Sequence, residues 1–332
     1  MRTMGLESKG FKGFKALGFA LALCAAAVAH GSAPELAGTI AVAPFTDVSA
    51  KATEFGALIG NPIVPALLLA TLQQSAVTTY GRFRTDAPIH AASYEIAPGQ
   101  TEEAIVYPSV DRIARMALAN PGSAREGKDV LHLVPSERHP QERYAVFSDD
   151  GQFVAFAPTV DVARRALADC QPSVIGECPL VRMNLRQAGL KAVGAAATAA
   201  GGTNVLNLVS GFAQMDISVD LGVRGLVIAF RAASGTGPVK ADGLKARVER
   251  ELQKLVSEFA AGEVKVAPAV RVGLEGTKVV VGEIVLSQAQ LKDLGQDFNA
   301  LVAAQMSGSL SGDRKNKGGS VKATAKGKEQ KK

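Results

Sequence analysis

Residues 144–168 read YAVFSDDGQFVAFAPTVDVARRALA and predict a strand, a tight turn, a second strand and a helix. The turn DDG at 149–151 separates two apolar runs, because Gly adopts positive φ without steric cost and Asp tolerates it. Pro158 has no N–H to continue a strand ladder, and Thr159 can cap the helix that follows. A hairpin followed by a helix indicates an antiparallel sheet with a helix nearby.

A similar unit returns near the C-terminus. Two apolar runs, 270–274 and 279–286, flank a Gly-containing turn, and a helix begins at Ser287. The chain has 332 residues, which is enough for two domains. We therefore expect an α+β fold with two similar halves, residues 30–169 and 170–306. Each half is predicted to be a mostly antiparallel sheet with helices packed on one face.

The first half is predicted to open with a strand at 39–44 and two helices at 47–58 and 63–76. The next run, 78–84, is strand-like, although its alternation is imperfect. The predicted helix at 63–76 has an apolar face made of Leu67, Leu68, Ala70, Leu72 and Ala76.

The N-terminus predicts export. Four basic residues precede the apolar run 16–29, and Ala27-Val28-Ala29 fits the small-x-small pattern for cleavage between Ala29 and His30. The alternatives are cleavage a few residues later, an uncleaved membrane anchor, or a lipoprotein modified at Cys24. We expect a periplasmic or extracellular protein.

Two cysteines remain after such cleavage, Cys170 and Cys178. An exported chain with one close pair most simply forms a disulfide bond. The competing interpretation is two buried free thiols. A metal site is disfavoured because two Cys alone supply only half of a tetrahedral shell.

The net charge of +6 belongs to the ends of the chain. The leader 1–29 carries +3 and the segment 313–332 carries +6, so the remaining body carries −3. A basic nucleic-acid surface on the body is therefore not indicated, and specific nucleic-acid binding is not expected.

The tail 307–332 is rich in Gly, Ser and Lys and is predicted to be disordered. It can either attract anionic surfaces or solubilise the protein. Its basic residues are Arg314, Lys315, Lys317, Lys322, Lys326, Lys328, Lys331 and Lys332.

No motif predicts catalysis, a metal or a cofactor. Residues 122–129, GSAREGKD, approach a P-loop, but Asp129 replaces the Ser or Thr that would hold magnesium. HExxH and GxSxG patterns are absent from the sequence. His132 is interpreted as a strand residue, and turn geometry already accounts for Asp149 and Asp150.

The plan of the chain resembles exported bacterial proteins of unknown function built from repeated α+β units. The resemblance rests on residues 144–168 and on strand pairs such as 212–232, and it implies neither an activity nor catalytic residues. The sequence favours a non-catalytic binding or scaffolding module of the cell envelope. One alternative is a hydrolase whose site forms between the halves from His132, His139 and Asp149. The other is a membrane-surface protein that uses its basic tail.

Overall fold

The structure is a computed structural model that describes residues 35–80, 82–97, 100–109, 124–126, 129–134, 141–170, 179–199, 208–235, 241–260 and 266–296. Its helices are α2 (Phe45–Leu58), α3 (Ile63–Tyr80), α5 (Val160–Asp169), α6 (Gln187–Ala199), α8 (Ala241–Ala260) and one at 288–296. Its strands are β1 (Glu35–Val42), β2 (Ile89–Ala97), β3 (Gln100–Pro108), β4 (Ala124–Glu126), β5 (Val130–His132), β6 (Tyr144–Phe147), β7 (Phe153–Ala157), β8 (Val181–Arg186), β9 (Phe212–Gly222), β10 (Gly225–Ser234), β11 (Ala269–Glu275) and β12 (Val279–Leu286).

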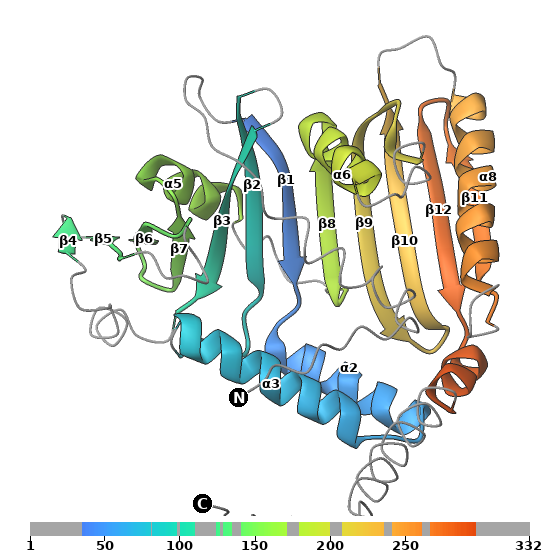
Figure 1. Cartoon of the computed structure of the whole chain (residues 1–332), viewed down its shortest axis with the longest axis horizontal. Coiled ribbons are helices and arrows are strands. Elements are labelled where there is room, and N and C mark those ends of the chain that lie inside the picture. Colours follow the sequence, from blue (N-terminus) through green and yellow to red (C-terminus); the bar gives the residue numbers. More distant parts are fainter. Residues whose placement is uncertain are drawn as a thin grey trace, which may run out of the picture.

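The α+β class with an antiparallel sheet is confirmed (Figure 1). The described strands form one 12-stranded sheet in the order β11-β12-β10-β9-β8-β1-β2-β3-β7-β6-β5-β4. The sequence predicted two sheets, but β1 pairs with β8 and places Thr39 opposite Asn184. Each of these strands is the first of its half, and in two separate sheets each would have one unpaired edge. Pairing satisfies the backbone groups of both edges and makes the sheet continuous.

The strand order is the same on either side of the β1–β8 pair. Outward from β1 come the hairpins β2-β3 and β7-β6, and outward from β8 come β9-β10 and β12-β11. Among the described strands, β4 and β5 extend the sheet beyond β6 on the first side and have no counterpart beyond β11. Two halves of like topology would give this order.

The turn at 149–151 forms as the sequence predicts. Gly151 has φ 69°, and β6 and β7 pair on either side of it. The Thr159 side chain caps α5, because its Oγ1 accepts a hydrogen bond from the Val162 N–H at 3.3 Å. This hairpin and helix therefore follow from local sequence alone.

Helices pack on both faces of the sheet. In the first half, α5 buries Val162 and Ala163 against one face. On the other face, Phe45 of α2 and Val77 of α3 pack near Phe147. Strand β6 is a continuous apolar run that is buried on both sides, so both faces need a cover. The prediction of helices on one face therefore describes only part of this half.

The strand predicted at 78–84 is wrong. Helix α3 continues to Tyr80, and Phe83 forms only an isolated bridge with Ser109. The β-branched and aromatic residues at 77–80 favour a strand locally. The packing of α3 along α2 and of Val77 on the sheet overrides that preference.

Candidate interaction surface

The hairpin of helices α2 and α3 runs beneath the lower ends of the strands, from the first half toward the helix at 288–296 (Figure 1). Its turn and second helix carry no formal charge, because no Asp, Glu, Lys or Arg lies between Glu54 and Arg82. Helix α3 is also apolar on every side rather than on one stripe. A globular helix of this composition is normally buried.

Helix α3 instead exposes its aliphatic side chains. Ile63 is 65% exposed, Leu67 62% and Leu72 53%, and these are three of the five large exposed hydrophobic residues in the described chain. Ala66 and Ala70 are exposed as well. The spacing of positions 63, 66, 67 and 70 places them on one side of the helix. We call Ile63, Ala66, Leu67 and Ala70 the α3 face; Leu72 lies on another side.

This exposure differs from what the sequence suggests. The apolar pattern at 63–76 predicts a helical face that includes Leu67 and Leu72, yet both side chains face solvent. A helix that is apolar all round cannot bury every side against a single neighbour. The charge-free run between Glu54 and Arg82 is the sequence signal that would have identified this surface.

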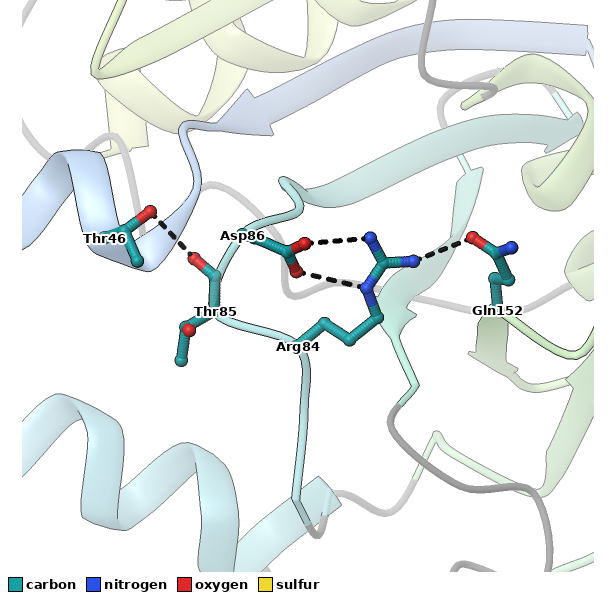
Figure 2. A network of polar contacts seen from close by, with 5 residues as sticks. All are labelled: Thr46, Arg84, Thr85, Asp86 and Gln152. Carbon is teal, nitrogen blue, oxygen red and sulfur yellow. Dashed lines mark hydrogen bonds and ion pairs between the residues drawn. The ribbon is translucent and has the colours of Figure 1, made fainter.

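The open end of the hairpin is fixed by a polar network (Figure 2). The Thr46 N–H and Oγ1 of α2 both donate to the Thr85 carbonyl, at 3.0 and 3.2 Å. Arg84 donates to both carboxylate oxygens of Asp86 at 3.1 Å and to Gln152 Oε1 at 2.7 Å. The hydrogen bonds from Arg84 hold the pKa of the Asp86 carboxyl group below its usual value. Because Gln152 belongs to the β6–β7 turn, the segment after α3 is tied to the sheet.

The closed end of the hairpin contacts the second half. Lys51 Nζ of α2 donates to the Leu221 carbonyl at the end of β9. Ile59, just after α2, lies against Gly295 of the helix at 288–296. Gly56 is buried against Pro62, so the two helices approach closely. The α3 face is therefore held on a scaffold anchored in both halves.

The chain between α6 and β9 is shorter than helix α3. Helix α6 occupies the corresponding place between β8 and β9, as α2 and α3 do between β1 and β2. Twelve residues separate Ala199 from Phe212, which is too few for the 18 residues of α3. A helix of the full length of α3 therefore does not fit between α6 and β9.

A shallow groove runs along α2 beside the polar network. Its volume is about 380 Å³, and its walls offer hydroxyl groups and one aromatic ring. Such walls can accept and donate hydrogen bonds, but they supply no acid or base. The lining residues described are Phe45, Thr46, Ser49, Ala50, Thr53 and Thr85.

Among the residues predicted to be functional, Cys170 is buried at the end of α5. Burial raises the pKa of its thiol to about 12. Cys178, the cleavage site at Ala29 and His30, and the basic tail lie outside the described residues. The disulfide, the leader and the tail therefore remain predictions.

Two residues of the hydrolase alternative, His132 and Asp149, lie apart. His132 ends β5 opposite Tyr144, where β6 begins, whereas Asp149 follows the end of β6. Asp149 is five positions beyond Tyr144, a distance of about 16 Å along extended backbone, so an ion pair between His132 and Asp149 is excluded. His139 lies outside the described residues. Asp150 accepts hydrogen bonds from Ser148 Oγ and the Gln152 N–H, which lower its pKa and define a turn role.

Neither a metal-binding cluster nor a membrane-spanning helix is found among the described residues. No group of three or more His, Cys, Asp or Glu is placed there to hold a metal ion. Within the same ranges, no helix has the length and hydropathy required to cross a membrane.

No family model and no curated protein matches the chain. Among solved structures, crystal form III of TP0453 aligns at TM-score 0.39 and 9% identity, covering 81% of this chain and 99% of that one. Crystal form I of TP0453 aligns at TM-score 0.35 and 8% identity, covering 81% and 95%. This chain is thus weakly similar to TP0453 in structure, and similarity at this level identifies no function.

Proposed function

We propose that this protein is a non-catalytic binding module of the cell envelope that docks to its partner through the α3 face. The observation that carries the proposal is the exposure of Ile63 and Leu67 on a helix without charged residues. Single exposed aliphatic residues are ordinary, but a contiguous apolar surface on a fixed element is typical of a binding site.

The energetics favour docking. Full burial of one Ile or Leu side chain contributes about 1.5–3 kcal/mol. The polar network at Arg84 and the Ile59–Gly295 contact already fix the hairpin. Little conformational entropy is then lost on association, because the binding element is preorganised.

Two other observations support a non-catalytic role in the envelope. The groove beside the network is lined by hydroxyl groups, and His132 and Asp149 lie at opposite ends of β6. The predicted leader at 1–29 supports export, and export would bring the α3 face into contact with envelope components.

The proposal is tested by fractionating an exporting host that carries either the wild type or the double variant Ile63→Asp/Leu67→Asp. Both positions are exposed, so we expect the variant to fold with stability changed by less than about 1 kcal/mol. The wild type should be recovered with the envelope and the variant in the soluble fraction. Val134→Asp is the matched control, because Val134 is 43% exposed on the segment after β5. Equal envelope retention of the double variant would overturn the proposal.

A further inference from the structure

We infer that the outer edge of strand β11 is a self-association surface, at which a second copy of this chain pairs its own β11 in the antiparallel direction. The inference goes beyond the proposed function, because it concerns a part of the molecule other than the α3 face. The feature that points to it is a self-complementary charge pattern, in which Arg271 and Glu275 lie symmetrically about Gly273 on an edge strand.

Strand β11 lies at one end of the sheet, where it pairs with β12 and with no other described strand (Figure 1). Its seven residues pair with β12 position for position and without a bulge. A short strand, a Pro, a Lys or a bulge commonly protects an edge from further pairing, and β11 has none of these. The strand at the opposite end, β4, has only three residues. Of the two described edges, β11 is therefore the one that can accept another strand.

The backbone groups of Val272 and Leu274 point outward from this edge. The Ser234 N–H of β10 donates to the Lys278 carbonyl at 2.8 Å, so Lys278 faces β10 and the next residue, Val279, faces β11. The direction of the N–H and C=O groups alternates along each antiparallel strand. Because β11 pairs with β12 without a bulge, the same alternation turns the groups of Val272 and Leu274 away from β12. An added strand can bond to them.

The charged side chains of β11 identify that strand as a second copy. Arg271 and Glu275 lie on the face of β11 away from α8, and their side chains are 78% and 57% exposed. A two-fold axis at Gly273 places Arg271 of each copy directly opposite Glu275 of the other. An axis at Arg271 or at Glu275 would oppose like charges, which destabilises a strand pair. Gly273 has no side chain to hold the two strands apart.

The ion pairs within each subunit continue across this axis. Arg224 and Arg271 donate to Glu283 at 3.0 and 3.3 Å, and Arg231 donates to Glu275 at 2.7 Å. Joining two copies at Gly273 extends these pairs into one row in which neighbouring charges have opposite sign. Along the row come Arg224, Glu283 and Arg271 of one copy, then Glu275 and Arg231 of the other. An exposed cross-strand pair changes affinity by up to about fivefold, so the row selects the partner and its register.

Helix α8 is compatible with this pairing. Arg247 donates to the Ser210 carbonyl, which precedes β9 and therefore lies toward the middle of the sheet. Val256 is nine positions further along, about two and a half turns, so it lies on the opposite side of α8, toward the edge. Lys245 and Glu249 share that side. Two α8 helices that approach each other across the axis thus present opposite charges and an apolar side chain.

Sedimentation of the purified protein over a range of concentrations tests the inference. We expect a dimer, and we expect Arg271→Glu or Glu275→Arg to weaken it by about tenfold or more, because each variant opposes like charges at two places. An equimolar mixture of the two variants should restore the dimer, since every opposed pair again has opposite signs. Restoration would also show that both variants are folded. A monomeric wild type, or a mixture that associates no better than its components, would overturn the inference.

A cysteine at the axis tests the register. A Cβ on Gly273 comes no closer than 3.5 Å to another side chain, so Gly273→Cys fits the strand. The axis brings the two copies of this position to about 4.5–5.5 Å between Cα atoms, which is within disulfide range. Ala269→Cys is the matched control, because Ala269 is exposed on the same face and its two copies lie about 27 Å apart. Oxidation should link Gly273→Cys alone, above the background set by the native cysteines of the wild type. Equal linking of the two variants would overturn the inference.

The double variant Ile63→Asp/Leu67→Asp separates this surface from the α3 face. Neither position belongs to β11, so this variant should dimerise as the wild type does. A monomeric double variant would assign the dimer to the α3 face and overturn the role of β11. A dimer that persists while envelope retention is lost would show that the two surfaces act independently.

Discussion

Gly295 lies directly against Ile59, although 236 positions separate them in the chain. A Cβ built on Gly295 would collide with the Ile59 side chain and lie 2.8 Å from its Cα. Real Cβ atoms do not approach backbone this closely, so the contact requires glycine. It joins the α2–α3 turn of the first half to the last described helix of the second.

Gly295→Ala should therefore destabilise the protein by about 1–3 kcal/mol, because the added methyl group must displace backbone. Urea denaturation of the wild type and the variant measures the difference. Gly222→Ala is the control, since a Cβ there meets nothing within 4 Å, and its stability should match the wild type. Equal stability of the two variants would mean that the turn and the last helix do not pack as described.

Thr159→Ala should lower the free energy of unfolding by about 1 kcal/mol, because the Val162 N–H loses its acceptor at the start of α5. Thr159→Ser keeps an oxygen at the cap and should restore most of the loss. Thermal denaturation of the three proteins gives the comparison. A serine variant no more stable than the alanine variant would show that the cap oxygen contributes nothing.

In its thiol form Cys170 should resist alkylation in the folded protein. Its side chain is buried, and the raised pKa of about 12 leaves almost no thiolate at pH 8. Iodoacetamide should react with it in urea and not in native buffer, as read by mass spectrometry. Rapid labelling of the native protein would contradict the buried position.

The same mass experiment tests the predicted disulfide with Cys178. A bonded pair makes the intact chain two hydrogens lighter, and Cys170 then reacts in urea only after reduction. Labelling of both cysteines in urea without reductant would show that the pair is not bonded.

His90 should make the folded state sensitive to acid. Its Nε2 is buried and has no hydrogen-bond partner among the described residues, and burial lowers its pKa. The unfolded chain then binds a proton at a higher pH than the folded protein does. Stability is retained above the unfolded pKa of about 6.5 and falls below it, by at most about 1.4 kcal/mol per pH unit.

His90→Leu removes this titration, so its free energy of unfolding should decline less than that of the wild type between pH 7 and pH 5. Denaturant titrations at the two pH values measure both declines. Parallel declines would rule out His90 as a source of the acid sensitivity.

Several local elements could be predicted because their causes lie within a few residues. The turn at 149–151 follows from an Asp-Asp-Gly sequence, and the start of α5 follows from Thr159. The alternation along β9 and β10 likewise predicts an antiparallel pair, and the register of that pair is observed. Each of these depends on backbone preference and on nearest neighbours in sequence.

The end of α3 could not be predicted in this way. Residues 77–80 are β-branched or aromatic and favour a strand, and the helix continues because α3 packs along α2 and Val77 packs on the sheet. The exposure of Leu67 escaped sequence analysis for a related reason. An apolar spacing shows which residues share a helical side and not whether another element covers that side.

Four properties could be read from the sequence alone: the α+β class, two hairpins that each precede a helix, the charge of the two ends, and the lack of recognised catalytic motifs. Long-range packing established three others: β1 pairs with β8 to make one sheet, Gly295 lies against Ile59, and α3 exposes Ile63 and Leu67. Caps, turns and alternation act between neighbours in the chain. Edge pairing and helix exposure instead depend on which distant surfaces meet, and that is settled by the whole chain burying as much apolar area as it can.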